Sequence, residues 1–282
     1  MLGRYSAAMS ESVDPRTPVA IATSGLPGEP RRILERIALA GVQAVQLSTD
    51  RRGTRPDDLD RSGRQDLRVV VRRHELRLAG IDHGVDPDDL CLPDRVDSAA
   101  TLLLEAIRLA GDLGPVPIAV RFPGEGADEV VATALATAER VGVTVVDFGV
   151  PPRGTAVRER AVGRPTGLII PGQTDETPTL HAARGDLIEG LTIGVDPPSW
   201  LAAGLDFEAV TGEGVGGVRL AGLTTEGWRV PAGGPGSRVD PALLVAMARS
   251  SGFEGDPVID TRGWAEPWQG IEITRSSLAV TD

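Results

Sequence analysis

Three aspartates stand where short β-branched segments end, and each could take part in acid–base chemistry. Asp147 ends the segment VTVVD, Asp196 ends LTIGVD, and Asp260 ends DPVID. Carboxylates that face each other across a sugar can move a proton between adjacent carbons, one as the base and the other as the acid. A lone aspartate here would be expected to cap the next helix. Because the pattern recurs, we expect a shared pocket with Asp147 and Asp260 as the catalytic pair.

Further polar side chains lie at or near other strand ends, and we assign them to substrate binding. Arg121 follows PVPIAV and Arg219 lies within GGVRLAGL. Two such guanidinium groups could clamp a phosphate or carboxylate, or could balance the charge of the aspartates. His83 closes a short strand, where it could bind a hydroxyl, transfer a proton or make a structural hydrogen bond. Glu226 and Trp228 follow Arg219 and could form a wall of the pocket.

The other residues of reactive type favour structural roles. His74 lies in an Arg-rich helical segment and His181 in an irregular region. Because the chain has only 3 histidines, a zinc centre built from several of them cannot form. Cys91 has no identifiable histidine partner that would make it a nucleophile. Trp264 and Trp268 could stack on a sugar ring, or seal the core or a subunit contact.

One pattern repeats along the chain and must position these residues. An amphipathic, Ala/Leu/Arg-rich helix is followed by a glycine and then by a β-branched segment, as in AERVG-VTVVD and LRLAG-IDH. Glycine suits the left-handed residue that ends a helix, and the β-branched segment suits a buried parallel strand. We expect strands at 18–24, 42–48, 116–122, 143–149, 191–196, 216–223 and 256–260, with a further short strand ending near His83. Helices include 57–79 and 95–114, the second with Leu102 on its buried face.

Eight strands alternating with helices predict a single (β/α)8 barrel, in which side chains at the carboxyl ends of the strands share one rim. The alternative, an open doubly wound sheet, lacks the G-x-G-x-x-G segment after its first strand. We place a flexible tail at 1–17 and the barrel domain at 18–282. Residues 151–180 do not follow the repeating helix–glycine–strand pattern, and we expect them to form an extended loop that covers the site.

Composition narrows the function classes. The net charge of −11 disfavours a broad nucleic-acid surface, which needs clustered cations. The single cysteine permits no intrachain disulfide, and no apolar stretch is long enough to span a membrane, so we expect a cytoplasmic protein. The chain contains no lysine, as expected for a GC-rich genome. Schiff-base chemistry on a lysine and a Walker-type phosphate loop are therefore excluded.

Three segments carry a resemblance to a known family. They are HGVDPDDLCLPDRVDSAATLLLEAIRLAGDLG, DLIEGLTIGVDPPSWLAAGLD, and GGVRLAGL with the following WRVPAGGPGSRVDPALLVAMARSSGFEGDPVID. In segment order, most of residues 18–275 resembles the xylose isomerase-like TIM barrels. That superfamily comprises the sugar phosphate isomerases and epimerases together with the endonuclease IV (AP endonuclease family 2) group. The resemblance implies a (β/α)8 barrel and a small sugar or sugar phosphate as ligand.

The same resemblance implies a metal site that this sequence has altered. Family members typically hold a divalent metal with Glu, Asp, His and Glu at the ends of strands 5 to 8. The corresponding positions are Asp147, Asp196, Arg219 and Asp260, of which only Asp196 keeps the family residue. An arginine cannot ligate a cation and repels one. We therefore expect no metal cofactor and a salt-bridge cluster in its place; Mn2+, Mg2+ or Co2+ bound by Asp196 with Asp147 and Asp260 is the alternative.

Two functions follow from this sequence. The first is a sugar or sugar-phosphate isomerase or epimerase acting at the barrel mouth. The second is a non-catalytic barrel, a pseudoenzyme, that binds a small polar ligand or a partner protein after loss of the metal site. A homo-oligomer is compatible with both, and nucleic acid and membrane partners with neither. The sequence leaves open whether the chain turns over a substrate.

Overall fold

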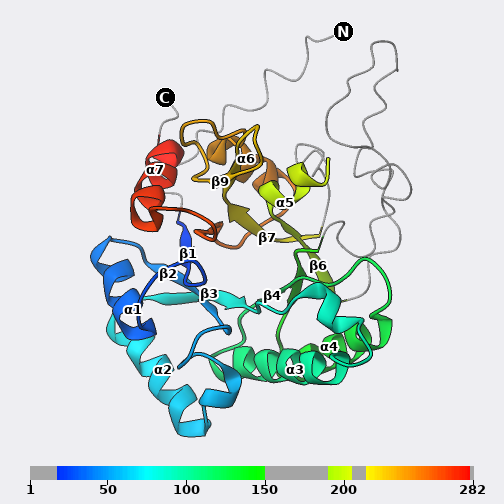
Figure 1. Cartoon of the computed structure of the whole chain (residues 1–282). Helices are drawn as coiled ribbons and strands as arrows, with labels where there is room; N and C mark the ends of the chain where they lie inside the picture. Colours follow the sequence, from blue (N-terminus) through cyan, green and yellow to red (C-terminus); the bar gives the residue numbers. More distant parts are fainter. Residues whose placement is uncertain (1–17, 150–189, 205–213, 280–282) are drawn as a thin grey trace, which may run out of the picture.

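Eight parallel strands close into a barrel in the computed structural model, which describes residues 18–149, 190–204 and 214–279. The strand order around the barrel is β1-β10-β7-β6-β5-β4-β3-β2, and every neighbouring pair is parallel. Figure 1 shows the helices arranged around the outside of this barrel. The predicted (β/α)8 architecture is therefore confirmed. The predicted tail at 1–17, the loop at 151–180 and His181 lie outside the described residues.

The barrel strands are short, and most of their residues are buried. They are β1 (Ala20–Ala22), β2 (Ala44–Ser48), β3 (Arg77–Asp82), β4 (Ile118–Val120), β5 (Val145–Asp147), β6 (Leu191–Val195), β7 (Val215–Leu220) and β10 (Val258–Ile259). Strands that are covered on both faces need β-branched and aliphatic side chains throughout rather than an alternating pattern. This explains why segments such as VTVVD predict them well.

The helices cover the outside of the barrel. They are α1 (Pro30–Leu39), α2 (Arg61–Arg73), α3 (Val96–Asp112), α4 (Asp128–Val141), α5 (Pro197–Ala202), α6 (Pro241–Ser250) and α7 (Pro267–Ala279). Helix α4 ends as predicted, with Gly142 in the left-handed conformation at φ 70°. Asp60 and Asp240 cap α2 and α6 by accepting hydrogen bonds from backbone N–H groups of the first turn.

The helix predicted at 57–79 is wrong at both ends: a short 3-10 turn covers Pro56–Asp58, and α2 begins only at Arg61. Helix α2 stops at Arg73, and Glu75 takes the left-handed conformation at φ 56° so that the chain can turn back into β3. The glycine of LRLAG does not end a helix, because Gly80 lies inside β3. A Cβ atom on Gly80 would come 2.8 Å from the carbonyl oxygen of Pro117, so the glycine permits close approach of the chain leading into β4.

Two smaller expectations also fail. Leu102 on α3 is 45% exposed, and its neighbour Leu103 is the residue that packs into the core. The strand predicted at 216–223 is divided after Leu220. Its last residues form β8 (Gly222–Leu223), which pairs antiparallel with β9 (Arg229–Val230) as a small hairpin. That hairpin matters for the site, because it directs Arg229 toward the barrel mouth.

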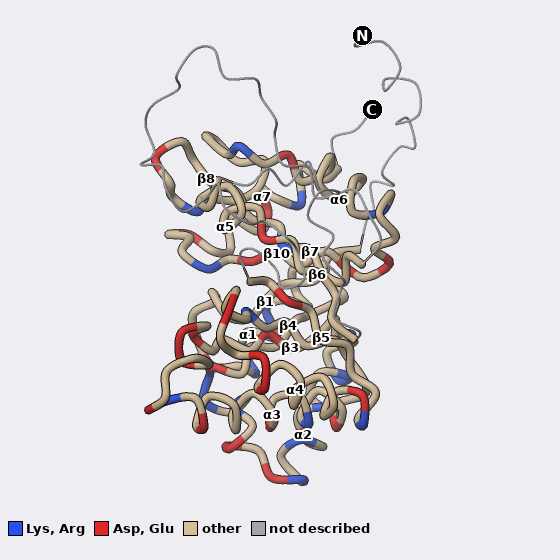
Figure 2. The backbone as a smooth tube through the Cα atoms, turned by 90° about the vertical axis from the view of Figure 1, so that its right-hand side faces the viewer, with Lys and Arg blue, Asp and Glu red and all other residues tan. Residues whose placement is uncertain are grey.

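Charge on the outer surface is mixed. Figure 2 shows acidic and basic residues interspersed along the outer helices α2, α3 and α4. Several of them form ion pairs, such as Arg64 on α2 with Asp112 at the end of α3. Across the described segments, no helix combines the length and the apolar character that a membrane crossing requires.

Candidate ligand site at the barrel mouth

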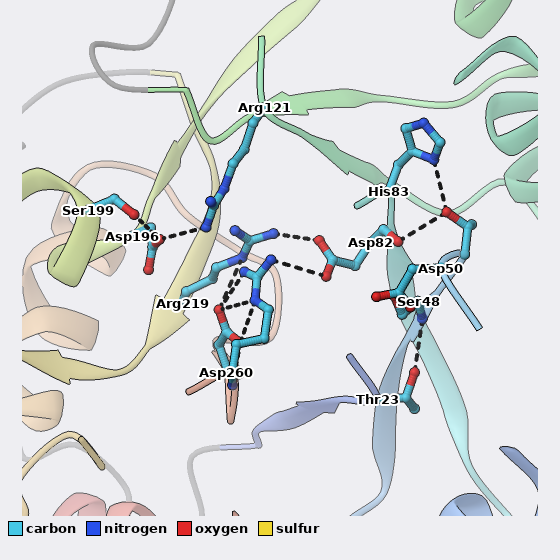
Figure 3. Close-up of polar contacts among 12 residues, drawn as sticks. Thr23, Ser48, Asp50, Asp82, His83, Arg121, Asp196, Ser199, Arg219 and Asp260 are labelled. Atoms are coloured by element: carbon cyan, nitrogen blue, oxygen red, sulfur yellow. Dashed lines mark hydrogen bonds and ion pairs between the residues drawn. The ribbon is translucent and has the colours of Figure 1, made fainter. Parts of the chain in front are cut away.

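Arginine and aspartate side chains from many strand ends meet at the carboxyl end of the barrel. Figure 3 shows most of them converging on the Arg219 guanidinium group, which lies between the carboxylates of Asp82 and Asp260. We call this set the mouth cluster; it consists of Asp82, Arg121, Asp196, Arg219, Arg229, Asp260 and Arg262. All of these residues except Arg229 lie at the end of a barrel strand or within three residues of it, as the barrel topology requires.

Arg219 is the central member and the most deeply buried arginine of the cluster, with 1% of its surface exposed. Its Nη2 atom donates to Asp82 Oδ1 at 2.6 Å, and its Nε atom lies 3.9 Å from Asp260 Oδ2. The guanidinium carbon stands 3.9 Å from the centre of the Phe148 ring, which adds a cation–π contact. Burial lowers the pKa of Arg219 to about 10, since desolvation outweighs the attraction of Asp82. The group is therefore still a cation at neutral pH.

Asp260 is held by several guanidinium groups at once. Arg262 Nε lies 2.9 Å from Oδ1 and Nη2 lies 2.5 Å from Oδ2, which is a bidentate pair. Arg229 Nη2 donates to Oδ2 at 3.0 Å. Burial alone would raise the pKa of Asp260, but the ion pairs with Arg262 and Arg229 outweigh burial and hold the pKa well below its usual range. Burial alone would lower the pKa of Arg262, but the neighbouring charges of Asp260 and Asp82 raise it overall.

Asp196 repeats this arrangement on the neighbouring strand. Arg229 bridges to it with Nη2 at 3.2 Å from Oδ1, and Arg121 Nη2 donates to Oδ2 at 3.2 Å. The Ser199 hydroxyl donates to the same Oδ2 atom at 2.5 Å. Burial pushes the pKa of Asp196 upward, but Arg229 and Arg219 lower it overall. Both carboxylates are therefore ionised and fully occupied by cations.

Asp147 is placed differently from the other two predicted aspartates. Its Oδ1 atom accepts hydrogen bonds from the backbone N–H groups of Gly149 at 2.7 Å and Phe122 at 3.1 Å. These bonds fix the backbone where the chain leaves β4 and β5. The structure thus brings Asp196 and Asp260 together through Arg229, and gives Asp147 a role in shaping the adjacent loops.

His83 lies beside the mouth cluster rather than within it. Figure 3 shows its imidazole on the opposite side of Asp82 from Arg219. The ring Nδ1 atom is 2.9 Å from the Thr49 hydroxyl oxygen. Burial lowers the pKa of His83 to about 4, against the opposing charges of Asp82 and Asp50, so the ring is neutral at pH 7.

The predicted wall residues and the tryptophans lie elsewhere. Glu226 and Trp228 belong to the turn of the β8–β9 hairpin, where both are exposed, Trp228 by 71%. Trp264 is buried against Gly270 of α7. Trp268 packs under Arg36 of α1, with the guanidinium carbon 4.0 Å from its ring centre. Both C-terminal tryptophans therefore seal contacts between helices.

A cavity of about 340 Å3 opens next to the mouth cluster. Arg121 and Ser199, which both bind Asp196, line it together with Phe122 and Phe148. The volume lies at the lower end of the range for small-molecule sites, about 300–1,000 Å3. The cavity therefore joins apolar walls to a charged end at Arg121.

Sequence reasoning missed three members of the mouth cluster. Asp82 immediately precedes His83, so the signal was present at the same strand end. Arg262 follows Asp260 by two residues and could have been found as its partner. Arg229 could not be predicted from the sequence, because it lies in a hairpin whose strands have two residues each and show no alternating hydrophobic pattern.

Comparison with known proteins identifies the fold. No protein-family model and no curated protein sequence matches the chain. Among solved structures, D-psicose 3-epimerase, crystallised in the presence of D-fructose, matches with a TM-score of 0.62 at 14% identity, covering 93% of this chain and 97% of that one. A xylose isomerase domain protein from Planctomyces limnophilus matches with a TM-score of 0.62 at 15% identity over 90% and 92%. L-ribulose 3-epimerase matches with a TM-score of 0.60 at 16% identity over 92% and 94%.

These matches define the class of fold as the xylose isomerase-like TIM barrel, as the sequence resemblance implied. A divalent metal is expected in many barrels of this class, so the donor set at the mouth must be tested against it. Asp196 and Asp260 each bind two or more guanidinium groups, and Arg219 cannot donate a lone pair. Within the described residues, no group of three or more Asp, Glu, His or Cys side chains is arranged to hold a metal ion. The residues present do not fit a divalent cation.

Proposed function

We propose that this protein binds a small, polar, sugar-like ligand at the barrel mouth and that it needs no divalent metal to do so. One observation carries the proposal: the Arg219 guanidinium, paired with Asp82 and flanked by Asp260, occupies the centre of the mouth beside a ligand-sized cavity. The permanent charge of the arginines supplies the positive potential that a metal supplies in related barrels.

Unpartnered donors support a ligand at this place. In the part of the chain that the structure describes, Arg121 Nε, Arg219 Nη1 and Arg229 Nε are buried without a hydrogen-bond acceptor. Buried donors without partners are costly, and groups of this kind are normally satisfied by water or by a ligand. Hydroxyl and carbonyl oxygens of a sugar are acceptors of the required type.

The state of the carboxylates favours binding over proton transfer. An acid–base pair works best with pKa values near the operating pH. Arg262 and Arg229 bind Asp260 and hold its pKa far below neutrality. At pH 7 Asp260 therefore carries no proton to donate as an acid, and it accepts a proton only weakly as a base. Asp147 Oδ1 already accepts hydrogen bonds from two backbone N–H groups, so this atom is engaged in holding the adjacent loops. We therefore favour a non-catalytic, ligand-binding barrel.

A metal-independent isomerase or epimerase is the second candidate. Its support is the common fold with D-psicose 3-epimerase and L-ribulose 3-epimerase. In this case Asp147 and Asp260 would exchange the proton, and Arg219 would stabilise negative charge on the substrate oxygen. The reaction would require the ligand to displace Arg262 or Arg229 from Asp260.

One set of experiments separates the two candidates. Metal-stripped protein is titrated with ketoses, aldoses, sugar acids and sugar phosphates by calorimetry. The same compounds are then incubated with this protein in D2O, and deuterium incorporation at carbon is measured. Binding without deuterium incorporation at carbon supports the ligand-binding barrel. Deuterium incorporation without added metal supports the isomerase. If the stripped protein binds none of these compounds, and Mn2+ restores binding, the proposal fails.

A further inference from the structure

Donors exceed acceptors at the barrel mouth. Every carboxylate of the mouth cluster is shared by at least two guanidinium groups: Asp82 by Arg219 and Arg262, Asp196 by Arg121 and Arg229, and Asp260 by Arg229 and Arg262. All three carboxylates are buried, with at most 2% of each residue exposed. The surplus is visible as unpartnered N–H groups on Arg121, Arg219 and Arg229 within the described residues.

The lowered pKa values of two arginines also indicate that positive charge at the mouth is incompletely compensated. Burial, together with the positive charge of Arg262, lowers the pKa of Arg121 despite its pair with Asp196. Burial also lowers the pKa of Arg219. A guanidinium group with a lowered pKa lies in surroundings that disfavour its charge. An anion bound at the mouth would relieve this cost, whereas a neutral sugar would not.

Arg121 is the member of the mouth cluster that lines the described cavity. It lines the cavity of about 340 Å3, and 34% of its side chain is exposed. It holds Asp196 through a single hydrogen bond at 3.2 Å, which leaves most of its planar fork available. Ser199 lines the same cavity at its charged end.

The neighbouring helix distinguishes between types of anion. Phosphate groups are commonly bound by free backbone N–H groups at a helix N-terminus. Helix α5 starts beside the cavity, but its first two residues are Pro197 and Pro198, which have no N–H group. Asp88 also lines the cavity and would repel a dianion more strongly than a monoanion. The cavity thus provides a planar fork for a carboxylate, and the start of α5 offers a phosphate fewer backbone donors than an ordinary helix N-terminus.

We propose that the ligand is a polyhydroxylated carboxylic acid, such as an aldonate or uronate, whose carboxylate binds the Arg121 guanidinium. This inference rests on the proposed function, which places the ligand at the mouth, and it specifies the class of that ligand. The ligand's carbon skeleton would lie along the cavity lining that includes Pro87 and Pro123, and the Ser199 hydroxyl oxygen, whose hydrogen goes to Asp196, would accept from a ligand hydroxyl.

The test compares D-gluconate, D-glucuronate and D-galacturonate with D-glucose, D-fructose and D-glucose 6-phosphate, by calorimetry on the full chain. We expect at least one acid to bind about 10-fold or more tightly than every neutral sugar and the phosphate, because a charge-assisted hydrogen bond is lost otherwise. Arg121→Gln should weaken acid binding about 10-fold or more and weaken the binding of neutral sugars by a smaller factor. Arg108→Gln, on the outer face of α3, is the matched control and should change nothing.

The outcomes are distinguishable. If a neutral sugar or the phosphate binds as tightly as the acids, or if Arg121→Gln leaves acid affinity unchanged in a protein with native circular dichroism, the carboxylate inference is wrong and the proposed function stands. If none of the six compounds binds, the proposed function is contradicted as well. Arg121→Lys keeps the charge without the fork, so intermediate acid affinity would support bidentate binding.

Discussion

The chain uses the same pair of residue types in two regions with opposite physical consequences. On the outer helices, Arg108 pairs with Glu105 within α3, and both side chains are exposed. In the mouth cluster, Arg219 pairs with Asp82 across the barrel, and both are buried. Exposed pairs contribute about 0–1 kcal/mol, whereas removing one partner of a buried pair costs about 3–5 kcal/mol because an uncompensated charge remains. The surface pairs are thus expected to contribute little to stability, whereas the buried pairs of the mouth cluster are expected to contribute much more.

The largest effect is expected from Asp82→Ala, which leaves the Arg219 cation buried without its main partner. The variant should lose about 3–5 kcal/mol of unfolding free energy, as measured by urea denaturation at pH 7. Asp82→Asn keeps the shape and should recover part of the loss through a neutral hydrogen bond. A loss below 1 kcal/mol for the alanine variant would show that Arg219 is not buried as described.

The pH dependence of stability should reveal His83. In the unfolded chain a histidine titrates near 6.5, whereas the folded value is about 4 because of burial. Between these values the unfolded state binds a proton that the folded state does not, so stability falls as the pH is lowered from about 6.5 to about 4. The loss across this window should be about 3 kcal/mol.

His83→Gln should flatten that part of the profile, as measured by urea midpoints at half-unit pH steps. His74→Gln, at the end of α2, serves as the matched control and should leave the slope in place. Below pH 4 a second decline is expected in both variants, because Asp260 and Asp196 have depressed pKa values and lose their ion pairs when they are protonated. An unchanged slope in His83→Gln would contradict the buried, neutral imidazole.

A smaller effect is expected from Arg229→Gln, which removes the bridge between Asp196 and Asp260. Arg262 still binds Asp260, and Arg121 still binds Asp196, so no carboxylate is left without a cation. We expect a loss of about 2 kcal/mol, typical of a hydrogen bond to a charged group. Arg238→Gln, on the exposed loop after the hairpin, is the control. An effect of Arg229→Gln as large as that of Asp82→Ala would mean that the bridge, not Arg219, organises the mouth.

The smallest effect belongs to the surface. Glu105→Ala removes the partner of Arg108 and one of the two partners of Arg64, and both of these ion pairs lie on the outer helices. The unfolding free energy should change by less than about 1 kcal/mol, and the change should shrink further at high salt. If Glu105→Ala lowered the unfolding free energy by 2 kcal/mol or more at every salt concentration, the surface pairs would be as important for stability as the buried pairs of the mouth cluster.

The fold could be predicted because buried parallel strands and their flanking helices leave a strong repeating pattern. The site could be predicted in part for the same reason: Asp196, Arg219 and Asp260 are found by their place at strand ends. Arg229 could not be found, since its short hairpin is specified by tertiary contacts around Gly222 rather than by a pattern. The end of α2 was misplaced because a helix-forming segment, LRLAG, continues into β3, where pairing with β2 overrides local preference.

A cluster of arginines and aspartates occupies the barrel mouth in place of a metal site, and a Mn2+ titration of purified, metal-stripped protein followed by thermal unfolding tests this most directly. A metal bound to the folded state alone would raise the midpoint with concentration. We predict that the midpoint stays constant in Mn2+ and in EDTA, and that elemental analysis finds no stoichiometric metal before stripping. A saturable rise of the midpoint with Mn2+, reversed by EDTA, would contradict the arginine cluster at the barrel mouth.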